Sequence, residues 1–158
     1  MLKFGYKITT MRFTVIIIIT VLLAACGKNK FNTTPQLSFT SIKPDTYKQG
    51  TTNLDDIPTM VFHVTDAEGD LGFKNGKDTS YIYFRNLKTN NFDSVSLPDI
   101  LTAGTKNFEG DIEVNMKQYI RVPNFAKKDT LYFDVYVKDF AKNKSNVVRT
   151  SKPLYYLP

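Results

Sequence analysis

Apolar residues recur at every second position along much of this chain, and that period is typical of strands. In segment 131–138, four apolar residues alternate with Tyr132, Asp134, Tyr136 and Lys138. A strand points successive side chains to opposite faces, so one set is buried and the other faces outward. No apolar stretch keeps helical spacing for more than two turns. The pattern predicts an all-β fold whose core includes Phe62, Val64, Ile112, Val114, Phe133, Val135 and Val137.

The same alternation predicts about seven strands along the chain. They cover residues 37–42, 60–65, 81–87, 92–97, 112–116, 131–138 and 147–156. Polar segments rich in turn residues separate them, and Asn90-Asn91 predicts a hairpin turn because asparagine tolerates positive φ. Without crossover helices, consecutive strands pair antiparallel. We therefore expect one antiparallel β-sandwich over residues 36–158.

The first 25 residues have the pattern of a secretory signal peptide. Lys3, Lys7 and Arg12 precede an apolar run, and no acid occurs before Asp45. From 13 to 25 the apolar segment is shorter than the roughly 20 residues that span a bilayer, which argues against a transmembrane helix. Met11 is an alternative start that would keep Arg12 as the basic region.

The end of this segment, Leu23-Ala24-Ala25-Cys26, resembles the lipobox of bacterial lipoproteins. The resemblance implies cleavage before Cys26, which is the only cysteine, and lipid on its sulfur. Several acyl chains on one residue give a stable membrane anchor. The alternative is an ordinary cleaved signal in which this cysteine has no special role.

The resemblance also implies a cellular location for the mature protein. The polar residues 26–35 form a lipidated tether. Gly27 stands where aspartate signals inner-membrane retention, so the outer membrane is expected. The basic sequence after Cys26 differs from the acidic surface-export signal and favours the periplasmic face.

Charge and composition narrow the function classes. Three of the 21 basic residues and none of the 15 acidic ones fall in the first 25 residues, so the remaining 133 residues have a net charge of +3. This small, mixed charge does not favour nucleic acid as a partner. With the one cysteine used for lipid, no disulfide forms within the mature chain.

Two segments resemble immunoglobulin-like domains of bacterial envelope proteins. Residues 62–72 resemble the strand followed by Asp-x-x-Gly-Asp-Leu-Gly that is found in immunoglobulin-like and cadherin-like domains of Bacteroidota-type lipoproteins. Residues 132–146 resemble a hairpin near the end of immunoglobulin-like and fibronectin-like domains, with Lys142 where glycine is usual. The resemblance implies a sandwich of immunoglobulin type. It says little about function, because one fold serves many functions.

Acidic residues cluster at predicted strand ends. In an immunoglobulin-like sandwich, the loops that hold Asp66, Glu68, Asp70, Asp78 and Asp139 meet at one end. Such oxygen ligands suit Ca²⁺, which makes calcium a candidate cofactor and a calcium-stabilised adhesion-type module a candidate function. The alternative is that Asp66 and Asp139 cap their own turns. Nearby lysines would then screen the remaining charge: Lys74, Lys77, Lys138, Lys142 and Lys144.

The sequence lacks the usual marks of catalysis. His63 is the only histidine and sits at an outward strand position, without a second histidine for a zinc site. No Gly-x-Ser-x-Gly nucleophile motif and no glycine-rich phosphate loop occurs. We therefore expect a non-enzymatic protein.

Tyrosines occupy the outward positions of two strands that we expect to be neighbours: Tyr81, Tyr83, Tyr132 and Tyr136. An aromatic face of this kind binds sugars or a partner protein in some proteins and forms stabilising cross-strand pairs in others. The sequence leaves both interpretations open.

These observations predict a membrane-tethered, non-catalytic binding or assembly module of the cell envelope. Its expected contacts are the membrane, through the lipid, and another envelope protein. The alternative is an accessory lipoprotein that binds a glycan or small ligand on the tyrosine face.

Overall fold

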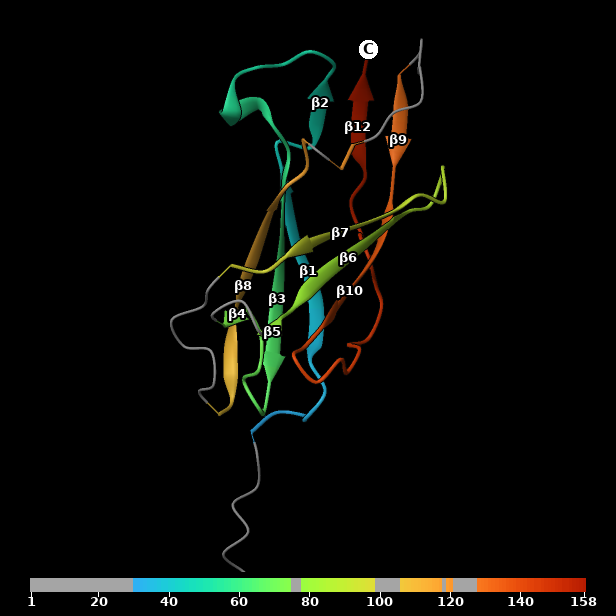
Figure 1. The fold of residues 1–158 in the computed structure, drawn as a ribbon. Helices are drawn as coiled ribbons and strands as arrows, with labels where there is room; N and C mark the ends of the chain where they lie inside the picture. Colours follow the sequence, from blue (N-terminus) through green and yellow to red (C-terminus); the bar gives the residue numbers. More distant parts are fainter. Residues whose placement is uncertain (1–29, 75–77, 99–105, 118, 121–127) are drawn as a thin grey trace, which may run out of the picture.

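The computed structural model describes residues 30–74, 78–98, 106–117, 119–120 and 128–158, and this part of the chain is mainly β-structure (Figure 1). A 3₁₀ turn, η1 (Leu54–Asp56), accompanies the strands. The strands are β1 (Gln36–Lys43), β2 (Thr46–Lys48), β3 (Thr59–Asp66), β4 (Phe73–Lys74), β5 (Asp78–Thr79), β6 (Tyr81–Asn86), β7 (Phe92–Ser96), β8 (Phe108–Asn115), β9 (Asp129–Leu131), β10 (Phe133–Lys138), β11 (Val148–Arg149) and β12 (Leu154–Leu157).

Two antiparallel sheets pack face to face around one apolar core. One has the strand order β1-β3-β8 and the other β11-β10-β6-β7. Figure 1 shows β6, β7 and β10 crossing the long strands of the first sheet at an angle. Phe62 of β3 meets Phe84 of β6 edge to face, with ring centroids 6.1 Å apart. Burial of such large side chains between the sheets is the main favourable term in folding.

The alternation read from the sequence is confirmed in its phase. All seven residues predicted for the core are buried, and in β3 every second side chain is fully or nearly fully buried. Asn90 adopts φ 58° in the turn between β6 and β7, as expected for this hairpin. The period of two therefore predicts which faces of β3 and β10 are buried. In β1 the phase changes at the register shift between Phe39 and Ser41, so Leu37 and Ile42 are both buried.

Strand continuity differs from the prediction, so twelve strands occur in the described residues instead of about seven. The predicted strand 131–138 breaks at Tyr132 into β9 and β10, and the last one divides into β11 and β12. The new ends form a third sheet, β2-β12-β9, in which β2 and β12 are parallel. Strand β2 of this exceptional pair lies between the first two predicted strands, where the sequence predicted no strand.

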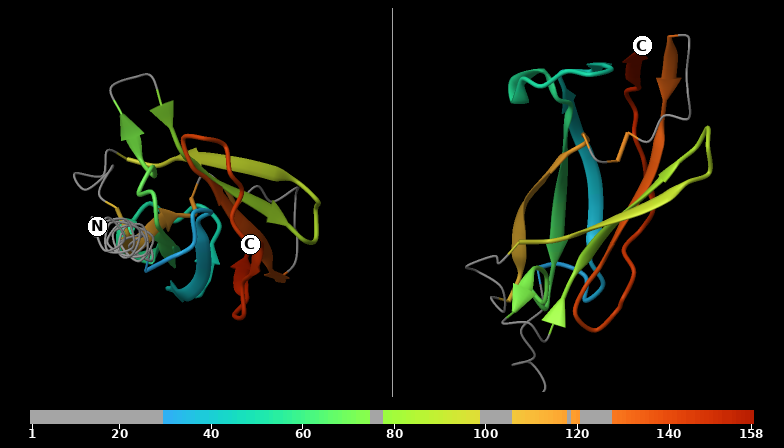
Figure 2. Two further views of the ribbon diagram at one scale, coloured as in Figure 1. Left: turned by 90° about the horizontal axis from the view of Figure 1, so that it is seen from below. Right: turned by 45° about the horizontal axis from the view of Figure 1, so that its top comes forward.

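The described part of the predicted tether, from Lys30 on, contacts the domain. The Lys30 backbone N–H donates to Asn107 Oδ1 at 2.9 Å, and its ammonium group pairs with Glu109 at 2.7 Å. The Ala67 N–H donates to the Asn32 carbonyl, and Pro35 is buried. Figures 1 and 2 show that this N-terminal part of the described chain and the C-terminus lie at opposite ends of an elongated molecule.

Candidate binding face and carboxylate cluster

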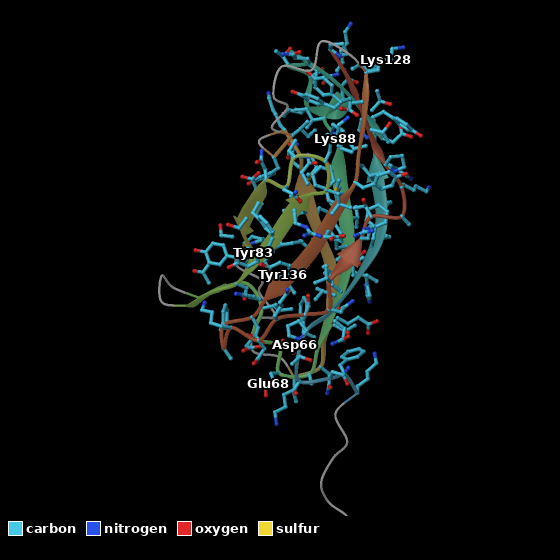
Figure 3. The ribbon with its side chains drawn as sticks, turned by 90° about the vertical axis from the view of Figure 1, so that its right-hand side faces the viewer. Asp66, Glu68, Tyr83, Lys88, Lys128 and Tyr136 are labelled. Carbon is cyan, nitrogen blue, oxygen red and sulfur yellow. The ribbon has the colours of Figure 1, made fainter. Side chains whose placement is uncertain are left out.

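Three of the four candidate tyrosines lie together on the outer face of the four-stranded sheet. Tyr83 of β6 is opposite Tyr136 of β10 in the strand register, and their rings stack with centroids 4.8 Å apart and planes inclined by 9° (Figure 3). Tyr81 lies 6.2 Å from Tyr83 by the same measure. The register of β6 and β10 thus assembles these side chains into one aromatic cluster.

Lysines cover the aromatic cluster. Lys144 places its ammonium group 4.1 Å from the centroid of the Tyr136 ring, and Lys138 places its own 5.5 Å from that of Tyr83. Cation–π contacts of this kind contribute about 0.5–1 kcal/mol at exposed sites. Burial, followed by the nearby Tyr83, raises the pKa of the Tyr136 hydroxyl. The cluster therefore combines tyrosine hydroxyls with ammonium groups, and much of its ring surface is covered.

Tyr132 is separate from this cluster. It lies at the break between β9 and β10, where its carbonyl accepts a hydrogen bond from Leu87, and it is 39% exposed. It lines a different depression, together with Leu87, Lys88, Thr130 and Arg149. The four tyrosines that share an outward phase in the sequence thus form three plus one in space.

Asp134 lies between Tyr132 and Tyr136 along the chain. The prediction that its side chain is exposed is wrong. Arg85 of β6 and Arg149 of β11 both donate hydrogen bonds to its carboxylate, the latter from Nε at 2.9 Å. The two arginines cover it, so it is 8% exposed although it faces outward. These hydrogen bonds, that of Arg149 first, hold the pKa of Asp134 below its usual range. Two ionic partners therefore accompany the burial of this charge.

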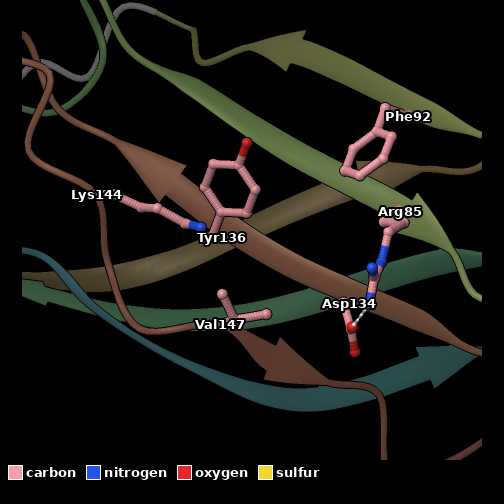
Figure 4. Close-up of a pocket in the computed structure, with 6 residues that line it drawn as sticks. All are labelled: Arg85, Phe92, Asp134, Tyr136, Lys144 and Val147. Carbon is pink, nitrogen blue, oxygen red and sulfur yellow. Dashed lines mark hydrogen bonds and ion pairs between the residues drawn. The ribbon is translucent and has the colours of Figure 1, made fainter.

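A shallow depression of about 260 Å³ adjoins the aromatic cluster. Figure 4 shows the six side chains around it: Arg85, Phe92, Asp134, Tyr136, Lys144 and Val147. Phe92 and Val147 are 64% and 50% exposed, so two apolar side chains beside the depression face solvent. We call the depression and the aromatic cluster together the sheet face. Arg85 could have been found from its outward phase with Tyr81 and Tyr83, whereas the contribution of Lys144 and Val147 depends on how segment 139–147 folds back.

A carboxylate cluster lies at the end of the domain next to Asn32, where β3 and β10 end (Figure 3). Asp66 ends β3, and Asp139 follows β10; both are fully buried. The Asp70 carbonyl accepts a hydrogen bond from the Phe140 N–H at 3.0 Å, which joins the two loops. The predicted meeting of Asp66, Asp70 and Asp139 at one end of the molecule is therefore found.

Asp139 caps its own turn. Its carboxylate accepts hydrogen bonds from the Asn143 N–H at 2.7 Å and from the Asn143 side chain at 2.8 Å. Lys142 adopts φ 71° in this turn, a left-handed conformation that favours glycine. For Asp139 the turn interpretation thus accounts for both carboxylate oxygens.

Asp66 and Asp70 are less completely paired. Asp66 Oδ1 accepts a hydrogen bond from Glu68 N–H at 3.3 Å, but Asp66 Oδ2 and Asp70 Oδ1 are buried without a hydrogen-bond partner in the described part of the chain. Burial, the chance to share a proton with Asp70, and the charges of Asp70 and Asp139 raise the pKa of Asp66 to about 7. Burial also raises the pKa of Asp139. These carboxyl groups are thus held where full ionisation is unfavourable.

The remaining acidic candidates do not join this cluster in the same way. Glu68 is exposed at the tip of the loop (Figure 3). Asp78 pairs with Lys74 through the backbone of β4 and β5, and its side chain lies outside the described structure. Within the described ranges, no three His, Cys, Asp or Glu side chains are arranged as a ready-made metal centre.

His63 belongs to a surface network on the other sheet. Its Nδ1 lies 2.8 Å from Asp111 Oδ1, and its Nε2 lies 3.5 Å from Glu109, which also binds Lys30. The Lys30 contact, followed by that of His63, lowers the pKa of Glu109. The network links the first described residue to β3 and β8.

The predicted lipobox and Cys26 lie outside the described residues. Among the residues that are described, no helix is long and apolar enough to cross a bilayer. The chain matches no protein-family model, no curated protein and no solved structure.

Proposed function

We propose that the protein is a lipid-anchored, non-catalytic binding module of the bacterial cell envelope whose sheet face binds an envelope partner protein. Lipid on Cys26 anchors the protein after residues 1–25 are removed. The protein then lies on the periplasmic face of the outer membrane. Leu23-Ala24-Ala25 before the cysteine and the basic residues ahead of the apolar run support this part.

The order of the strands supports an immunoglobulin-like domain. In that fold, strands A, B and E share one sheet, and C, F and G form the other. Here β1, β3 and β8 pair in that order and pack on β11, β10 and β6, with β7 as an additional edge strand. If β1, β3 and β8 are taken as strands A, B and E, and β6, β10 and β11 as strands C, F and G, the letters also run in alphabetical order along the chain.

The observation that carries the proposal is the exposure of Phe92 and Val147 beside basic side chains. Apolar side chains surrounded by charged groups are typical of interfaces, in which a few buried anchors supply most of the binding energy. The outward positions of β6, β10 and β11, with Lys144, carry four basic residues and one acidic residue: Arg85, Lys138, Lys144, Arg149 and Asp134. The complementary partner has an apolar centre with an acidic rim.

The same geometry weighs against a sugar stacked on the tyrosines. Tyr136 has Tyr83 on one side and the Lys144 ammonium group against its ring, so its ring surface is already occupied. Phe92, which is 64% exposed, is the more exposed of the two aromatic side chains that line the depression. A glycan or small ligand therefore remains the second candidate, at the depression beside Phe92.

Site-specific photo-crosslinking in living cells tests the partner. A photoreactive phenylalanine analogue replaces Phe92, and a matched control replaces Leu54, which is 70% exposed in η1, away from the sheet face. We expect a discrete protein adduct from position 92 that Lys144→Glu removes, and none from position 54. Equal adducts from both positions, or an adduct insensitive to Lys144→Glu, would count against the sheet face.

A further inference from the structure

The two buried carboxylate oxygens without a hydrogen-bond partner need a proton or a cation to balance their charge. Asp66 is 0% exposed, and neither Asp66 Oδ2 nor Asp70 Oδ1 receives a hydrogen bond from the described residues. A buried ionised carboxylate is strongly unfavourable unless it is paired or coordinates a cation. Native proteins keep few such unsatisfied groups, and each one calls for an explanation.

The lysines expected to screen this cluster are engaged elsewhere. Lys138 and Lys144 lie against tyrosine rings on the sheet face, and the Lys142 ammonium group donates to the Thr79 carbonyl at 3.3 Å. The side chains of the other two candidates, Lys74 and Lys77, lie outside the described structure. Lys138, Lys142 and Lys144 therefore do not supply a positive charge to Asp66 and Asp70.

We propose that Asp66 and Asp70 bind a calcium ion at the end of the domain where the β3–β4 loop meets the turn after β10. This inference is independent of the partner that the sheet face binds. The charge balance favours a divalent ion. The three carboxylates of Asp66, Asp70 and Asp139 retain two negative charges with one shared proton, and only one with a bound Ca²⁺.

The surroundings fit calcium better than magnesium. Asp66 is oriented by its bond to the Glu68 N–H, and Gly69 adopts φ 66°, so the loop turns tightly between the two aspartates. Ca²⁺ accepts six to eight oxygens in irregular geometry, including main-chain carbonyls and water, whereas Mg²⁺ requires an octahedron. With two carboxylates as ligands and no ready-made third, we expect a weak site, with Kd of about 10⁻⁴–10⁻³ M as in extracellular calcium modules.

The ion would stiffen the end of the domain that leads to the anchor. The loop residue next to Asp66, Ala67, donates its N–H to Asn32 and accepts a hydrogen bond from Asn107 through its carbonyl. Asp70 is bonded to Phe140. Neutralising Asp66 and Asp70 therefore stabilises contacts that join both sheets to the segment next to the tether.

Thermal unfolding of the mature protein in detergent at pH 8 tests the site. At 5 mM Ca²⁺ we expect the midpoint to rise by about 4–10 °C over that in EDTA, because a ligand bound only to the folded state stabilises it by mass action. Mg²⁺ at the same concentration should do less. Asp66→Asn and Asp70→Asn should each remove the response, whereas Asp55→Asn, an exposed acid in η1, should keep it.

Equilibrium dialysis with radioactive Ca²⁺ gives a readout that does not depend on the folding of a variant. Wild-type protein should bind one ion at pH 8 and bind it several-fold more weakly at pH 6, where protons compete for Asp66. If no ion binds up to 10 mM Ca²⁺, or if the melting point falls between pH 6 and pH 8 identically in Ca²⁺ and in EDTA, the pair holds only a proton and the proposal is wrong.

Discussion

Tyr83 and Tyr136 lie directly opposite each other on β6 and β10, with nearly parallel rings 4.8 Å apart. This pair joins the two central strands of the sheet that carries the proposed binding surface. Aromatic cross-strand pairs of this type stabilise a sheet whatever else they do. The tyrosines are thus a structural platform, and the exposed groups beside them are the better candidates for recognition.

The stacked pair predicts an energetic coupling between its members. In a double-mutant cycle of Tyr83→Ala and Tyr136→Ala, we expect a coupling energy of about 0.5–1.5 kcal/mol in the free energy of unfolding. Urea denaturation measures it. Tyr155 makes no ring contact in the described structure, so the cycle of Tyr83→Ala and Tyr155→Ala should be close to additive and serves as the control. Additivity for both pairs would contradict a stabilising stack.

The core predicts a sharp contrast between two adjacent residues. Phe133 is 1% exposed and Tyr132 is 39% exposed. Phe133→Ala should lower the free energy of unfolding by about 3–5 kcal/mol, because it leaves a cavity in the core. Tyr132→Ala should cost less than about 1 kcal/mol. Equal costs would mean that the strand faces are inverted.

Asp66 predicts that stability falls as the pH rises when calcium is absent. Its pKa is raised from 3.8 to about 7 in the folded protein, so folding favours its protonated form. The stabilisation from this proton is complete below about pH 4 and is lost as the pH passes through about 7. In EDTA, the melting temperature should therefore drop between pH 5 and pH 8. Asp66→Asn should flatten this part of the profile, whereas an unchanged profile would argue against the buried pair.

Asp134 predicts the opposite pH dependence. Its pKa is lowered by Arg149 and Arg85, so its contribution is present above the unfolded pKa and is lost as the pH falls through the folded value. Asp134→Asn should cost about 1–2 kcal/mol at pH 7, because two partly exposed ionic hydrogen bonds weaken. The cost should shrink at pH 3 in urea titrations. A cost that does not change with pH would point to packing instead of charge.

The lipid anchor predicts how the protein partitions in detergent. Wild-type protein should enter the detergent phase of a cloud-point separation and carry acyl chains on its N-terminal residue by mass spectrometry. Cys26→Ser should abolish labelling by a radioactive fatty acid and leave the protein in the aqueous phase. A wild-type N-terminus without lipid would contradict the anchor, whatever happens in the variant.

Local features of the fold could be predicted from the sequence because they depend on the pleat of a single strand. Side chains alternate between faces with a period of two, so the buried phases of β3 and β10 follow from the order of their own residues. The turn at Asn90 and the capping of its turn by Asp139 are local in the same sense, since each involves neighbours in the chain.

The lateral neighbours were decided by the tertiary structure. Asp134 is buried because arginines 49 and 15 residues away in the sequence lie on the flanking strands β6 and β11. Likewise, β2 gains a parallel partner only because the chain end β12 passes beside it. Alternation identifies the face on which a side chain lies, but which residues meet there depends on strand order and register. Those are set by contacts between segments far apart in the chain, which the period of any one strand does not specify.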